Sequence, residues 1–119
     1  MARLMSSTEL HQRIEKDEDF VLIDVLSPDD FEKEHIPGAI NIPVAQLRQR
    51  AKSDLSTNQR IVVYGENHDE TMSSQASTLL EELGFRKVAD FDGGINAWKR
   101  AGFLTEGTDP KIVGEMAEL

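Results

Sequence analysis

The sequence has 119 residues, of which 39% are hydrophobic and 29% are charged, proportions typical of one globular domain. It contains no cysteine, which excludes disulfides and thiolate chemistry within this chain, and its net charge of −9 argues against nucleic acid as a partner. No apolar run approaches the roughly 20 residues of a membrane-spanning helix. Residues 1–7 lack the apolar core of a signal peptide, so we expect a cytoplasmic protein without membrane contact.

The first half of the chain alternates predicted helices with apolar strands. Ser6 and Glu9 have the spacing of a capping box, and Ser27 can cap a second helix that Pro28 begins. The apolar run 20–25 is typical of a strand covered on both faces, as in a parallel sheet. The predicted elements of this half are helix 7–16, strand 20–25, short helix 28–35, strand 39–43 and helix 44–52.

The second half continues the alternation. Its predicted elements are strand 60–64, which we expect at the sheet centre, helix 72–83, strand 87–91 and helix 95–101. Gly84 is placed to end the long helix, and Trp98 on the last helix is predicted to be a core residue. The alternation predicts an α/β domain with a sheet wound in parallel. For the residues after Thr105, a docked helix and a frayed end both stay open.

Three segments together resemble a known family. They are "LIDVLSPDDFEKEHIPGAINIP", "VVYG" followed by "SSQASTLLEELGF", and "FDGGINAW". In this order and at this spacing they resemble a rhodanese-like domain, the fold of thiosulfate and related sulfurtransferases. The resemblance implies a five-stranded, mostly parallel central sheet with helices on both faces. One domain would occupy residues 1–119, with a core of about 6–107 and a tail over 108–119.

The resemblance also implies a cysteine directly after the tyrosine of the active-site strand, where its thiolate would accept a sulfane sulfur as a persulfide. Here Gly65 follows Tyr64, so no catalytic residue is predicted, and we interpret Gly65 as allowing close backbone approach while removing the reactive atom. The loop is longer than the commonest family loop and is similar to a subgroup with a second cysteine, near the place that Glu70 occupies. The active-site-like loop comprises Gly65, Glu66, Asn67, His68, Asp69, Glu70, Thr71, Met72 and Ser73.

Several residues near this loop are of types that can act in catalysis, but we predict structural roles for them. Asp24, at the end of a buried strand, is expected to bind backbone amides, and His35 is expected to fix a turn through hydrogen bonds. Ser73 and Ser74 are predicted to cap the following helix, since no nucleophile elbow is present. His11 on a polar helix face suggests no function.

The loop carries Glu66, Asp69 and Glu70 and no basic residue, so it should repel thiosulfate, persulfide or phosphate. We therefore predict a binding or regulatory module without sulfurtransferase activity, cofactor or metal, whose partner is an unknown protein or small ligand at the loop. Two alternatives stay open: an enzyme using Glu66, His68, Asp69 and Glu70 with a metal or cationic substrate, and a sulfurtransferase whose cysteine was replaced by Gly65. The apolar tail residues Ile112, Val113 and Met116 leave a homodimer open.

Overall fold

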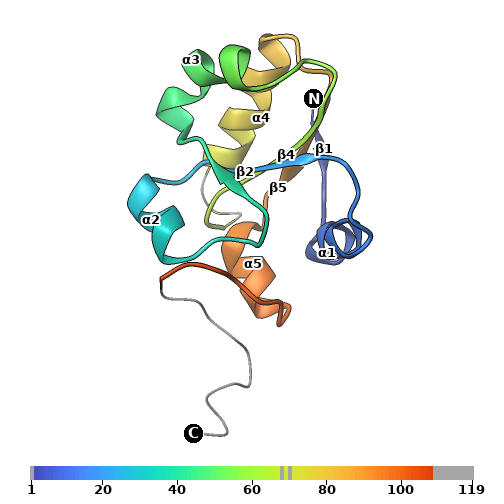
Figure 1. Ribbon diagram of the computed structural model, residues 1–119, viewed down its shortest axis with the longest axis vertical. Coiled ribbons are helices and arrows are strands. Elements are labelled where there is room, and N and C mark those ends of the chain that lie inside the picture. Colours follow the sequence, from blue (N-terminus) through green and yellow to red (C-terminus); the bar gives the residue numbers. More distant parts are fainter. Residues whose placement is uncertain (1, 68, 70, 109–119) are drawn as a thin grey trace, which may run out of the picture.

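A five-stranded parallel sheet organises the computed structural model, which describes residues 2–67, 69 and 71–108 (Figure 1). The strands run in the order β1-β5-β4-β2-β3, and all pairings between neighbouring strands are parallel. Their bounds are β1 (Arg3–Leu4), β2 (Val21–Asp24), β3 (Ile40–Asn41), β4 (Arg60–Tyr64) and β5 (Lys87–Phe91). β4 lies at the centre, as its unbroken apolar sequence predicts.

Helices cover both faces of this sheet (Figure 1). They are α1 (Ser7–Glu15), α2 (Pro28–Lys33), α3 (Val44–Asp54), α4 (Met72–Glu82) and α5 (Gly94–Arg100). Alternate strand residues point to opposite faces, so the strands feed two cores. One core joins strand residues such as Ile23 and Val63 to Leu47 and Leu80 of α3 and α4. The other core joins its strand residues to α1 and α5, and its largest members are Tyr64, Phe91, Leu10 and Trp98.

Local sequence signals explain where several helices begin and end. The Ser6 hydroxyl accepts a hydrogen bond from the Glu9 amide at 3.1 Å, as a capping residue should. The Glu9 carboxylate does not complete the predicted capping box, because it binds the guanidinium groups of Arg3 and Arg13 instead. At the end of α4, Gly84 adopts a φ of 99°, which reverses the chain at low cost.

The two edge strands are the shortest elements of the sheet. β1 has two residues, pairs with Ala89 and Asp90 of β5, and is absent from the elements predicted above. A two-residue strand cannot show the alternation by which strands are recognised. At the other edge, the predicted strand 39–43 contributes only Ile40 and Asn41 to the ladder.

After α5 the chain returns to α2 and packs against it. His35 and Glu106 exchange two backbone hydrogen bonds of 2.8 and 2.9 Å in an isolated antiparallel bridge. Trp98 is buried as predicted, and its indole N–H donates to the Leu104 carbonyl at 2.8 Å. His11, for which the sequence suggests no function, stacks its ring on Phe103 with centroids 3.9 Å apart. The predictions for the tail from residue 109 lie outside the described residues.

No helix among residues 2–67, 69 and 71–108 has the length and apolarity needed to cross a bilayer.

Candidate functional site

The candidate site lies where the central strand ends. β4 stops at Tyr64, Gly65 is buried directly behind it, and α4 begins at Met72. In open α/β sheets, ligands bind outside the carboxyl ends of the strands, which is where this loop lies. Glu66 and Asp69 are exposed, whereas His68 and Glu70 are outside the described residues.

The beginning of the loop is held against the first turn of α5. The Ile95 amide donates to the Gly65 carbonyl at 3.0 Å, and the Asn96 amide donates to the Glu66 carbonyl at 2.9 Å. Gly94 permits this close approach, since it has a φ of 68° and a Cβ built on it would lie 2.5 Å from the Glu66 carbonyl carbon. These amides at the positive end of α5 therefore bind loop carbonyls and are not available to an anion.

The far end of the loop corrects the prediction for the two serines. α4 begins at Met72 with Thr71 as its N-cap, so Ser73 and Ser74 lie inside its first turn and do not cap it. The Ser74 hydroxyl donates to the Thr71 carbonyl at 3.1 Å. Ser73 is buried beside Asp90, where burial raises the pKa of Asp90 and the Ser73 hydroxyl opposes that rise. Ser73 is buried and Ser74 is exposed, but both lie within the first turn of α4 and not at the sharp strand-to-helix turn of a nucleophile elbow.

Asp24 is the buried acid nearest to this edge of the sheet. It is the register partner of Tyr64, and its Oδ1 accepts a hydrogen bond from the Leu26 amide at 2.9 Å, as a structural acid would. Its Oδ2 is buried without a hydrogen-bond partner among the described residues, although the Tyr64 hydroxyl faces the carboxylate. Burial raises the pKa of Asp24 to about 6, against the opposing effects of the Leu26 amide, Tyr64 and His35.

Tyr64 and His35 connect Asp24 to the turn after α2. The Tyr64 hydroxyl accepts a hydrogen bond from the Ile36 amide at 3.0 Å, and burial raises the pKa of Tyr64. His35 stacks on Phe31 with centroids 4.0 Å apart, and its Nδ1 lies 2.7 Å from the Phe31 carbonyl oxygen. These contacts hold the His35 ring against the end of α2, which is a structural role.

A small pocket adjoins the loop, with a volume of about 190 Å³. Sequence reasoning missed it, because its walls come from α2, the loop and α5. Its charged lining includes Glu66, whose loop position was predicted, together with a Lys99–Glu34 ion pair of 2.9 Å. The lining residues are Leu26, Asp30, Lys33, Glu34, Glu66, Ile95, Asn96 and Lys99.

Comparison with known proteins places this geometry in a family. A family model described as a rhodanese-like domain matches residues 6–101. The chain belongs to the rhodanese-like domain family. The family and the five-stranded α/β fold predicted from the sequence are thus confirmed.

Known proteins resemble the chain over most of its length. The putative sulfur carrier protein YrkF of Bacillus subtilis is 31% identical over 87 residues, which are 73% of this chain and 45% of that protein. A sulfurtransferase of Allochromatium vinosum is 30% identical over 102 residues, covering 86% of this chain and 92% of that one. The solution structure of the rhodanese-like domain of the Anabaena protein Alr3790 superposes with a TM-score of 0.83 at 34% identity, covering 92% and 82% of the two chains.

The chain spans about half the length of the first of its curated relatives, YrkF among them. The residue directly after the central strand is Gly65. The resemblance implies a cysteine thiolate there, and Gly65 has no side chain that could replace it.

The described residues do not assemble a metal site in this rhodanese-like domain. No three His, Asp or Glu side chains among residues 2–67, 69 and 71–108 come close enough together to hold an ion. Two of the four ligands considered from the sequence, His68 and Glu70, fall outside those residues. The metal-dependent alternative therefore stays a hypothesis without an observation in its favour.

Proposed function

We propose that this rhodanese-like domain does not transfer sulfur and acts as a binding module that recognises a basic segment of a partner protein. One observation carries the proposal: Gly65 occupies the buried end of the central strand, and the chain contains no cysteine. Sulfane sulfur is carried on a thiolate, and no other side chain can form a persulfide.

The charges around the loop support a basic rather than an anionic ligand. Glu66 and Asp69 are exposed on the loop, and Asp30 and Glu34 line the adjoining pocket. Lys99 in the pocket is already paired with Glu34. The first amides of α5 bind loop carbonyls, so the positive charge of the pocket comes from Lys33 and Lys99, against the three carboxylates of Asp30, Glu34 and Glu66. A lysine or arginine side chain would gain favourable interactions here, whereas thiosulfate would be repelled.

Direct assay is expected to show no sulfur transfer. Protein incubated with thiosulfate should keep its mass, with no addition of a sulfur atom, because no thiol is present to accept it. Thiocyanate formation after addition of cyanide should equal that of a heat-treated sample. A sulfur adduct that survives gel filtration and is removed by cyanide would contradict the proposal.

Restoring the thiol alone is expected to restore little activity. In G65C the acidic loop should raise the pKa of the new thiol and repel thiosulfate. Neutralising the neighbours in G65C/E66Q/E70Q should raise the transfer rate over G65C by roughly tenfold, the effect of about one unit of thiol pKa. The pKa follows from the pH dependence of alkylation by iodoacetamide, with E66Q/E70Q as the thiol-free control. A fast G65C enzyme with a low thiol pKa would show that the loop charges do not oppose the chemistry.

A basic probe peptide should bind at the loop. In a titration with a short peptide of alternating lysine and alanine, followed by amide NMR, we expect shifts at Gly65, Glu66, Asp69 and Asn96. The shifts should diminish at high salt, because exposed charge pairs are screened. A peptide with glutamate in place of lysine is the matched control. Amide shifts of equal size at exposed acidic residues far from the loop, or no shifts at the loop, would count against the loop as the binding site.

A further inference from the structure

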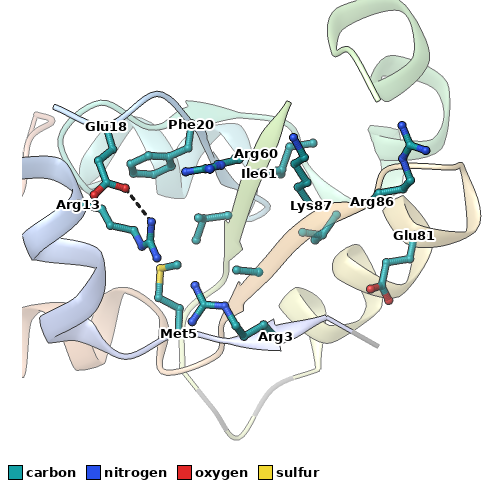
Figure 2. Close-up of a pocket in the computed structure, with 13 residues that line it drawn as sticks. Arg3, Met5, Arg13, Glu18, Phe20, Arg60, Ile61, Glu81, Arg86 and Lys87 are labelled. Carbon is teal, nitrogen blue, oxygen red and sulfur yellow. Dashed lines mark hydrogen bonds and ion pairs between the residues drawn. The ribbon is translucent and has the colours of Figure 1, made fainter. Parts of the chain in front are cut away.

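Basic side chains gather at the edge of the sheet opposite the loop. A pocket of about 440 Å³ opens at the amino ends of β4 and β5 and beside β1 (Figure 2). It is lined by five of the 13 basic residues of the chain but only two of its 22 acidic residues. This local excess of positive charge is opposite in sign to the net charge of the protein, which is −9. The basic lining residues are Arg3, Arg13, Arg60, Arg86 and Lys87.

These five cations fall into two groups. Arg3 and Arg13 both bind Glu9, whose pKa they lower to about 2, and Arg13 also binds Glu18 at 2.7 Å. Their charge is therefore largely compensated within the protein. Arg60, Arg86 and Lys87 form no ion pair with an acidic side chain among the described residues, and Arg86 donates only to the neutral Asn58 amide oxygen.

Two of the uncompensated cations stand side by side. Arg60 and Lys87 are register partners at the first positions of β4 and β5. Like charges at paired positions of neighbouring strands destabilise a sheet. An anion between them would remove this repulsion, and the planar guanidinium of Arg60 can bind a phosphate through two parallel hydrogen bonds.

Apart from the carboxylates of Glu18, which is paired with Arg13, and Glu81, the rest of the pocket lining is apolar. Figure 2 shows Phe20 beside Arg60 on one side of the pocket and Met5 near Arg3 on the other. Ile61 and Val62 of β4 and Val88 and Ala89 of β5 complete the apolar lining. Such a combination of apolar surface with a few converging charged groups is typical of sites for small organic ligands, and the volume lies within their usual range of about 300–1,000 Å³.

We propose that this amino-edge pocket binds a small organic anion of the nucleoside phosphate type, with its phosphates between Arg60, Arg86 and Lys87 and its planar ring against Phe20. The three cations supply the charge, and the half-buried aromatic ring supplies a face for stacking. The pocket lies at the amino ends of β4 and β5, whereas Gly65 follows the carboxyl end of β4, so the proposal does not depend on the function of the loop.

Isothermal calorimetry with three probes tests the proposal on the whole chain. ADP carries both the phosphates and the ring, inorganic pyrophosphate carries the charge alone, and adenosine carries the ring alone. We expect ADP to bind at least roughly tenfold more tightly than either of the others. In R60Q/K87Q the affinity for ADP should fall by about tenfold or more, and in R60E/K87E further, with a thermal melt verifying that each variant is folded.

The matched control is R48E/K52E, which makes the same change of net charge on exposed positions of α3, outside the lining of the pocket. It should retain the affinity of the unaltered protein. Three results would each overturn the proposal: no binding of ADP at about 1 mM, equal affinity for ADP in R60Q/K87Q, or pyrophosphate binding as tightly as ADP. Equal losses in R60E/K87E and in R48E/K52E would assign the binding to overall charge and would likewise overturn it.

Discussion

Replacing Gly94 with alanine is expected to lower the free energy of unfolding by about 3–5 kcal/mol, which is among the largest effects of a single substitution. The new methyl group would lie 2.5 Å from the Glu66 carbonyl carbon and 2.6 Å from the carbonyl oxygens of Glu66 and Gly65. These are backbone atoms that two hydrogen bonds hold against α5, so neither side can yield without breaking them. The φ of 68° adds strain of about 1–2 kcal/mol for any residue with a Cβ. Urea denaturation of both proteins measures the difference.

Gly102 provides the matched control for this substitution. It also has a positive φ, of 88°, but a Cβ built on it meets no atom within 4 Å. G102A should therefore cost only about 1 kcal/mol, the strain of the backbone conformation alone. If G94A and G102A lost equal stability, the contact between the loop and α5 would not be the cause.

Replacing Asp24 with asparagine is expected to stabilise the protein at neutral pH by on the order of 2 kcal/mol. Burial raises the pKa of Asp24 from 3.8 to about 6, so the folded protein binds this proton more tightly than the unfolded chain does. The stability that protonation of Asp24 adds to the folded protein is fully present below pH 3.8, and it is lost as the pH rises through about 6. Asparagine retains the acceptor for the Leu26 amide and carries no charge to desolvate.

The test is the pH dependence of unfolding by urea between about pH 4 and pH 8. The stability difference between D24N and the unaltered protein should be small at the acidic end and should grow through pH 6. E82Q serves as the control, because Glu82 is an exposed carboxylate with only a distant ion pair to Arg48. If the difference in stability between D24N and the unaltered protein stayed constant across this range, the cost of burying the charged form of Asp24 would not be its cause.

The interior strands were the most predictable part of the fold. β4 and β5 begin and end at the predicted residues, because β4 is a run of apolar residues after Arg60 and β5 is a short segment between Gly84 and the turn at Gly93. Helix ends were predicted to within one or two residues where a capping serine or a terminal glycine marks them, as at Ser6 and Gly84.

The failures share one physical cause, which is dependence on contacts between distant segments. β1 exists because Arg3 and Leu4 find an unpaired side of β5, and nothing in its two residues indicates a strand. Ser73 and Ser74 have the composition of caps, but Thr71 takes the N-cap position and Ser73 is drawn into the core beside Asp90.

The loop was predictable and its surroundings were not. Gly65 and its acidic neighbours follow directly from the order of residues after the strand. Both pockets, in contrast, collect side chains from several elements, so that Arg3, Arg60 and Lys87 become neighbours only after the strands pair.

The short length of β1 and β3 limits the association of copies of this domain through the edges of their sheets. Each border of the sheet offers only two residues of ladder, although Leu4 and Ile40 on these borders are exposed hydrophobic residues. A strand from a neighbouring molecule would find too few backbone groups for stable addition, which protects the native protein against fibrous aggregation at high concentration.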